Sequence, residues 1–194
     1  MERLTRDDLY SLEKYAQLRP QMRAQVLEHK KNRAVPIGPN ATLYFEDRLT
    51  MHYQIQEMLR AERVFEAEGI QDELNAYNPM IPDGANLKAT FMLEYPDERE
   101  RRAALAGLKG VEDRVWMQVH GFDKVWAIAD EDLERENEEK TSSVHFLRFE
   151  FNPTMITAVK AGAPLAIGID HAAYRYTVDP IASHVCASLV KDFS

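Results

Sequence analysis

The sequence predicts an α+β fold, a single domain over residues 1–194 in which N-terminal helices pack on a largely antiparallel sheet. Helix-type patterns gather in residues 5–76, strand-rich segments then follow one another closely, and 45% of the 194 residues are hydrophobic. Helices and strands that are segregated along a chain favour an antiparallel sheet over alternating parallel units. A chain of this length and composition can bury one sizeable core.

The first predicted elements are two short helices and a strand. Thr5 and Asp8 form a pattern similar to a capping box, and the amphipathic helix that they begin ends before Pro20. Pro20 then begins a second helix, because its fixed φ suits the first helical turn. After a loop at residues 35–40 that contains two prolines and a glycine, residues 41–46 are rich in strand-forming residues.

The longest predicted helix covers residues 51–68. Thr50 is a good N-cap for this helix, and Gly69 ends it. A short turn of helix follows at residues 72–76. We expect the segment 78–84 to be irregular, because its two prolines restrict both their own backbone and that of the residues before them.

The second half of the chain is rich in strands and contains three predicted helices. One helix covers residues 97–108, a short one begins after Asn152 and ends at Gly162, and the last covers residues 181–193. The acidic run 130–139 is either a solvated helix or a mobile loop, since it has almost nothing apolar to bury. The predicted strands cover residues 87–95, 114–122, 124–129, 144–151 and 165–176, the last of them broken near His171.

The composition argues against several classes of function. A formal net charge of −8 and a pI near 5.3 argue against a nucleic-acid partner, whose binding would need a basic patch. The one dense basic stretch, residues 29–33, is interpreted as a helix end, where cations stabilise free carbonyl groups. Cys186 is the only cysteine, so neither an intramolecular disulfide nor a thiolate cluster is expected. No nucleotide cofactor is expected either, because the glycines lack the spacing of phosphate-binding loops.

The sequence also predicts where the protein is found. The N-terminal residues lack the apolar stretch of a signal peptide, and no later run has the length of a membrane span. We therefore expect a cytoplasmic protein with no membrane partner. A homodimer is compatible with this expectation, because an uncovered strand edge can pair with a second copy.

Glu62 is an unusual residue within the longest predicted helix. At about 100° per residue, with Met51 at zero, Ile55 lies near about 40° and Glu62 near about 20°, so that the carboxylate points toward the core. Burying an unpaired carboxylate costs several kcal/mol. Glu62 is therefore expected to be protonated, paired with a cation or bound to a metal ion.

Two histidines are predicted to point toward the same core. His145 alternates with Leu147 and Phe149 on the more apolar face of its strand. The apolar alternation of residues 165–169 ends on His171. Two histidines and a carboxylate have the composition of a 2-His-1-carboxylate site, which suits non-haem iron or manganese.

The predicted metal ligands are therefore Glu62, His145 and His171, with Glu66 one helical turn further along as a possible second carboxylate. The alternative is structural, with both histidines hydrogen-bonded to backbone and Glu62 paired with a buried arginine such as Arg148. The spacing of these residues along the chain does not decide between the two interpretations.

Three functional hypotheses follow from these patterns. The first is a protein that binds iron or a similar divalent metal and serves redox or oxygen-related chemistry. The second is an interaction protein that docks a redox partner through Tyr53, Glu57 and Arg60, together with the acidic run 130–139. The third is a metal-free enzyme with His171 as general base, although no nucleophile motif accompanies it. Whether the protein is an enzyme stays open.

Five stretches of the chain form a wider pattern, at residues 37–39, 45–48, 53–62, 143–149 and 168–171. Together they resemble an uncharacterised bacterial family that is catalogued as domain of unknown function 3501. Its members are often encoded near rubrerythrin and iron–sulfur electron-carrier proteins. The resemblance implies a context of peroxide defence or iron-dependent redox metabolism, with a rubrerythrin-like or iron–sulfur protein as partner. It includes the positions of Glu62, His145 and His171 and implies no particular reaction.

Overall fold

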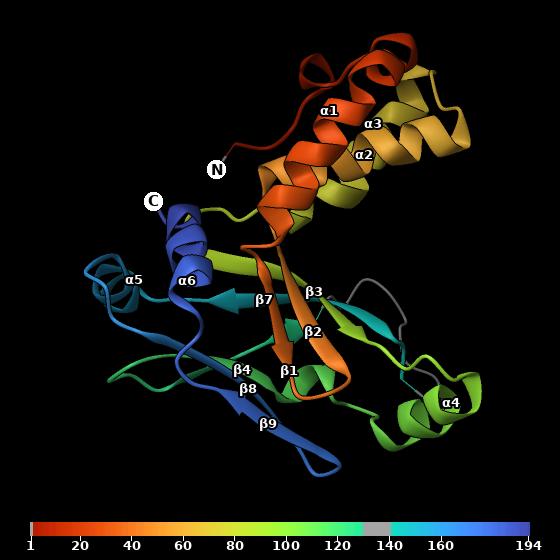
Figure 1. Ribbon diagram of the computed structural model, residues 1–194. Helices are drawn as coiled ribbons and strands as arrows, with labels where there is room; N and C mark the ends of the chain where they lie inside the picture. The colour runs from red at the N-terminus through yellow and green to blue at the C-terminus, as the bar shows by residue number, and fades with distance from the viewer. Residues whose placement is uncertain (1, 130–140) are drawn as a thin grey trace.

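The computed structural model describes residues 2–129 and 141–194, whose strands form two sheets (Figure 1). In spatial order, the five-stranded sheet consists of β1 (Ala34–Ile37), β2 (Ala41–Glu46), β3 (Asn86–Leu93), β7 (Val144–Glu150) and β6 (Ile128–Ala129). The four-stranded sheet consists of β5 (Lys124–Trp126), β4 (Val115–Val119), β8 (Leu165–His171) and β9 (Tyr174–Val178). Every strand pair in the described ranges is antiparallel, so the predicted α+β class is confirmed.

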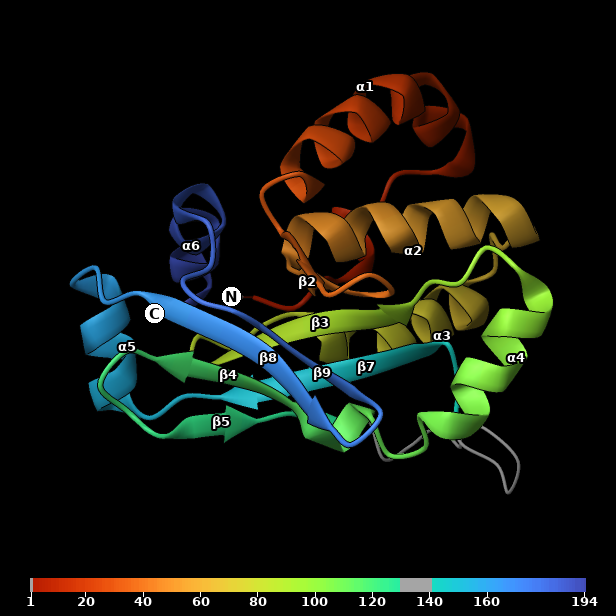
Figure 2. The same ribbon diagram turned by 60° about the horizontal axis from the view of Figure 1, so that its bottom comes forward.

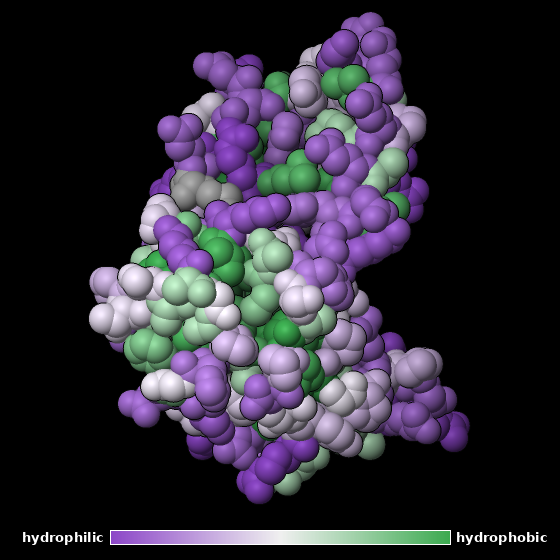
Figure 3. Space-filling model, turned by 60° about the vertical axis from the view of Figure 1, so that its left-hand side comes forward, coloured by the Kyte–Doolittle hydropathy of each residue, from purple (hydrophilic) through white to green (hydrophobic). Residues whose placement is uncertain are grey.

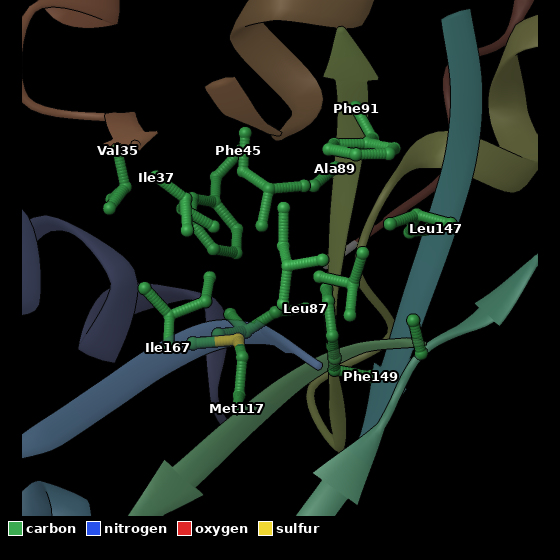
Figure 4. Packing of buried hydrophobic residues seen from close by; sticks show 14 of the residues in the cluster. Val35, Ile37, Phe45, Leu87, Ala89, Phe91, Met117, Leu147, Phe149 and Ile167 are labelled. Atoms are coloured by element: carbon green, nitrogen blue, oxygen red, sulfur yellow. The ribbon is translucent and has the colours of Figure 1, made fainter. Parts of the chain in front are cut away.

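The main hydrophobic core lies between the two sheets. Strand alternation places every second side chain of β2, β3 and β7 on the face that meets β4 and β8. Figure 4 shows Phe45, Leu87 and Phe149 of the first sheet packed toward Met117 and Ile167 of the second. All five side chains are buried, so this face of the five-stranded sheet is filled.

Three helices cover the opposite face of the five-stranded sheet. They are α1 (Leu12–Lys30), α2 (Arg48–Glu62) and α3 (Ala67–Tyr77), and they lie together at the top of the molecule in Figure 1, whereas α3 is seen behind the strands in Figure 2. A second hydrophobic cluster, which includes Ile55, Leu59 and Leu74, holds them together. Phe146 of β7 packs against this cluster, and so joins the helical layer to the sheet.

The remaining helices lie at the ends of the sheets. α4 (Glu98–Gly107) and α5 (Pro153–Lys160) are at opposite ends, and α6 (Ser183–Leu189) lies near α5 (Figures 1 and 2). Short 3₁₀ helices occur at η1 (Arg6–Asp8), η2 (Asn78–Met80), η3 (Glu112–Arg114) and η4 (Val190–Asp192). On the face drawn in Figure 3, hydrophilic side chains cover most of the helical layer. No helix in residues 2–129 and 141–194 is long and apolar enough to cross a membrane.

The prediction of two N-terminal helices was wrong, because one continuous helix runs through Pro20. Only the short η1 forms at the capping pattern of Thr5 and Asp8, and α1 begins at Leu12. Proline in a helix interior removes one hydrogen bond. Here α1 packs along α2, with Tyr15 and Val26 buried on either side of Pro20, and this packing compensates the loss.

The predicted helix 51–68 is in fact two helices. α2 begins after the N-cap Asp47, whose side chain accepts a hydrogen bond from the Thr50 amide at 3.0 Å, and it ends at Glu62. Arg63 adopts a left-handed conformation with φ of 57°, which a periodicity argument does not anticipate. Gly69 then lies inside α3 instead of ending a helix.

The predicted strand 124–129 is also divided. β5 belongs to the four-stranded sheet, whereas β6 belongs to the five-stranded one, with Ala127 between them. The predicted break near His171 is confirmed, since it separates β8 from β9, and so are the helices at 97–108 and 152–162 apart from their exact ends. The acidic run 130–139 lies outside the described residues.

Candidate functional site

A pocket of about 350 Å³ lies between the helical layer and the five-stranded sheet. We call it the Glu46 pocket. The strands contribute Tyr44, Glu46, Thr90, Met92, Val144 and Phe146 to its lining. The helical layer contributes Lys30, Met51, Gln54, Tyr77 and Met80.

The register of the sheet places these strand residues side by side. Tyr44 pairs with Thr90, which pairs in turn with Phe146. Met92 pairs with Val144 in the neighbouring row. Because alternate residues of these strands fill the core between the sheets, the remaining ones point to the helices. The pocket therefore lies between two rows of paired strand residues on the sheet and the helices on the other side.

Glu46 is the buried acidic group of this pocket. Its residue is only 4% exposed. The Thr90 hydroxyl donates a hydrogen bond to Glu46 Oε1 at 2.7 Å, whereas Oε2 is buried and has no hydrogen-bond partner among the described residues. Leaving one buried carboxyl oxygen unsatisfied costs free energy that is comparable to a lost hydrogen bond. Glu46 is therefore incompletely paired in the protein alone.

A buried arginine holds the backbone at Glu46. Arg33 is 2% exposed, and its guanidinium donates hydrogen bonds to the carbonyl oxygens of Phe45 at 2.9 Å and Glu46 at 3.2 Å. It also forms an ion pair with Asp192 of η4, where burial raises the pKa of Asp192 to about 6. The predicted helix end at residues 29–33 is confirmed, since α1 ends at Lys30, but Arg33 lies beyond it and is a core residue.

The comparisons with known proteins agree with the pattern seen in the sequence. A family model described as "Protein of unknown function (DUF3501)" matches residues 3–193. This chain belongs to the DUF3501 family. It is 54% identical to a protein of unknown function from Burkholderia pseudomallei K96243, whose crystal structure superimposes with a TM-score of 0.95 over 100% of both chains. No functionally curated protein is detectably similar to this DUF3501 chain.

The two predicted carboxylate ligands of this DUF3501 protein lie on its surface. Glu62 is the last residue of α2 and is exposed, so the prediction that it points into the core was wrong. The helix turns to a left-handed residue immediately afterwards, which ends the apolar stripe before Glu62 can be covered. Glu66 is the exposed N-cap residue of α3. Arg148, the predicted alternative partner of Glu62, instead forms an ion pair with Glu150.

His145 lies in the core, as its strand pattern predicted. It is 2% exposed, and its Nε2 lies 3.0 Å from both the Ser142 carbonyl oxygen and the Thr141 hydroxyl. The carboxylate of Glu112 is 3.8 Å away. Because a carbonyl oxygen only accepts hydrogen bonds, Nε2 carries a proton in this arrangement.

His171 is half-buried at the end of β8 and uses both ring nitrogens locally. Nε2 donates a hydrogen bond to the Lys109 carbonyl oxygen at 3.1 Å, and Nδ1 accepts one from the Ala173 amide at 3.2 Å. His171 borders an open hollow of about 450 Å³ whose charged groups include an ion pair between Arg175 and Asp170 at 2.8 Å. The Ala173 hydrogen bond stabilises the turn between β8 and β9, and the Lys109 hydrogen bond joins this turn to the segment between α4 and η3, in agreement with the structural alternative.

The structure does not assemble the predicted ligands into one site. In the part of the chain that is described, no three histidine, cysteine, aspartate or glutamate side chains lie close enough to hold a metal ion. Glu62, Glu66, His145 and His171 therefore do not meet there as a group. The prediction failed at Glu62 because this residue lies in the exposed last turn of α2, where no described segment covers the continuation of the apolar stripe.

The predicted docking face is covered by another part of the chain. Arg19 of α1 forms a two-pronged ion pair with Glu57, at 2.7 and 2.8 Å, and the Tyr15 hydroxyl donates a further hydrogen bond at 2.6 Å. Tyr53 is half-buried beside them. This face of α2 therefore packs on α1, and of Tyr53, Glu57 and Arg60 only Arg60 is exposed. The acidic run that completed the predicted surface lies outside the described residues.

Sequence reasoning did not single out Glu46. One signal was available, because Thr42, Tyr44 and Glu46 alternate with apolar residues and so form a polar face on their strand. Such a face is usually solvated. Its burial here depends on the three helices that pack over it, and no local pattern specifies that arrangement.

Proposed function

We propose that this DUF3501 protein binds a small molecule in the Glu46 pocket. The observation that carries the proposal is the buried Oε2 of Glu46, which has no hydrogen-bond partner in the described part of the chain while its residue borders a mostly apolar pocket. A volume of about 350 Å³ lies in the range of small-molecule sites, which are typically apolar with a few placed polar groups. A ligand that contacts Glu46 would satisfy the unpaired oxygen.

The lining favours binding over nucleophilic catalysis. Its described residues include neither histidine, cysteine nor serine. The Thr90 hydroxyl donates its hydrogen bond to Glu46 Oε1 at 2.7 Å and thereby orients the carboxyl group. A site with one anchoring carboxylate among apolar side chains is suited to recognition.

The pocket can be tested with methionine methyl NMR. Three of its lining residues are Met51, Met80 and Met92, whereas Met117 and Met155 belong to the core between the sheets. We expect that a fragment library screened against protein labelled with 13C at the methionine methyls contains compounds that saturably shift the three pocket signals. The two core signals serve as an internal control. If no compound shifts the pocket signals, or if all five signals shift together, the proposal fails.

A second candidate function is divalent-metal binding, as predicted from the sequence, but at a site around His145 that does not include Glu62 or His171. The observation that favours it is the buried pair of His145 and Glu112, with the Thr141 hydroxyl between them. These residue types suit iron, manganese or zinc. A metal ion would have to replace the proton that Nε2 donates to Ser142. The link to redox metabolism and the redox protein partner stay predictions.

Titration of the purified protein with ferrous, manganous and zinc ions tests this second function. If His145 is a ligand, stoichiometric binding is lost in His145→Ala and kept in His171→Ala, the matched control with a histidine bound to backbone. Equal binding by both variants contradicts metal binding at His145.

A further inference from the structure

We infer that the ligand of the Glu46 pocket is an organic amine, with an apolar body and a protonated nitrogen that binds Glu46 Oε2. The inference rests on the proposed function, since it presupposes that the pocket binds a small molecule. It adds the chemical class of that molecule.

The hydrogen-bonding state of Glu46 requires a donor. Oε1 already accepts a hydrogen bond from the Thr90 hydroxyl, and Oε2 is buried without a partner in the described residues. An ionised carboxylate only accepts hydrogen bonds. The group that completes Glu46 must therefore bring an N–H or O–H, and a second carboxylate or a phosphate at this position would be repelled.

The unpaired oxygen belongs to a carboxyl group, and the strongest hydrogen bonds to a carboxylate come from charged donors. Lys30 is the basic residue among the described lining residues of the pocket, and it lies on the helical side. A charged donor binds the Glu46 carboxylate better than a neutral one, because charge-assisted hydrogen bonds are about twice as strong as neutral ones.

The rest of the lining fits the apolar body of such a ligand. Met51, Met80 and Met92 supply flexible, polarisable side chains that adapt to different shapes. Tyr44 and Tyr77 add aromatic rings, and aromatic faces also attract cations. A hydrophobic amine therefore matches both the buried charge and the apolar walls.

Three probes that share a phenyl group and a short alkyl chain test the inference on the full chain. They are 2-phenylethylamine, 2-phenylethanol and 3-phenylpropionate, and binding is followed by the methyl signals of Met51, Met80 and Met92. We expect the amine to bind at least about tenfold more tightly than the alcohol, and the carboxylate to bind most weakly.

Two charge-to-amide variants complete the test. Glu46→Gln should bring the amine within about twofold of the alcohol, whereas Glu28→Gln, which removes an exposed carboxylate outside the described lining, should keep the preference for the amine. Equal binding of amine and alcohol by the unmodified protein overturns the inference and leaves the proposed pocket intact. If none of the three probes shifts the pocket signals, the inference is overturned, while the proposed pocket is decided separately by the fragment library. The comparison of probes on the unmodified protein needs no variant to fold.

Discussion

Glu57 joins α1 to α2, and replacing it by glutamine should destabilise the protein in a manner that depends on pH. Its carboxylate accepts hydrogen bonds from Arg19 and from the Tyr15 hydroxyl. The Arg19 hydrogen bonds are the main cause that lowers the pKa of Glu57 from 4.5 to about 2. Glu57→Gln keeps the shape of the side chain and removes its charge.

The pKa of Glu57 sets the size of the effect. One pKa unit corresponds to about 1.36 kcal/mol, so lowering the pKa from 4.5 to about 2 corresponds to about 3 kcal/mol. The Glu57 side chain is 24% exposed, and screening by solvent reduces the expected loss at pH 7 to about 2 kcal/mol. Because the folded-state pKa is lowered, this stabilisation is complete above about pH 4.5 and is lost as the pH falls toward 2.

Urea unfolding followed by circular dichroism at pH 7, 5, 4 and 3 measures the effect. The difference in unfolding free energy between the unmodified protein and Glu57→Gln should be about 2 kcal/mol at pH 7 and shrink by about half at pH 3. The control is Glu28→Gln, whose partner Lys31 lies 2.5 Å away in an exposed ion pair and which should cost less than about 0.5 kcal/mol. A difference that stays constant down to pH 3, or that equals the control, would refute this reasoning.

Two further predictions concern the Arg33 ion pair and the turn at Gly38. Arg33→Met should lower the unfolding free energy by about 3–5 kcal/mol, because it leaves Asp192 buried without its cation, and the double variant Arg33→Met/Asp192→Leu should recover most of this loss in urea unfolding. A double variant no more stable than the single one would contradict the reasoning. Gly38→Ala should cost at least about 1 kcal/mol more than Gly110→Ala, since both residues have φ of 74° but only a Cβ at position 38 would come within 2.6 Å of the Tyr176 ring. Equal thermal unfolding midpoints for the two alanine variants would show that the close approach at Gly38 relaxes without cost.

Local signals predicted those parts of the fold that local interactions determine. Asp97 and Asn152 cap α4 and α5, with side chains that accept amide hydrogen bonds at 2.9 Å. Both helices were predicted to begin at these residues, the second of them from its capping pattern. The errors occurred where packing between segments that are distant in the sequence determines whether a helix continues or ends. Pro20 stays inside a helix because α2 supports it, and Arg63 ends a helix whose apolar pattern continues beyond it.

The sequence predicted the candidate site less well than it predicted the fold. His145 was correctly placed on the core face, because strand alternation is a local property. The position of Glu62 was wrong, because Glu62 lies in the exposed last turn of α2, and periodicity does not show where the cover of a helix ends. Glu46 belongs to a correctly predicted strand, but its burial requires the contact between the helical layer and the sheet. A strand face that is partly polar can therefore be either solvated or buried, and the choice depends on which segments pack over it.

The chain segment from β5 to β6 connects the two sheets directly. A single residue, Ala127, separates the two strands, and its amide donates a hydrogen bond to the Val115 carbonyl oxygen of β4 at 2.9 Å. Separating β6 from β7 therefore also strains the hydrogen bond between Ala127 and β4. Separating the strands of the four-stranded sheet likewise strains the edge of the five-stranded sheet. The two sheets are thereby coupled into one cooperative unit, whose slowest-exchanging amides should become accessible to deuterium together.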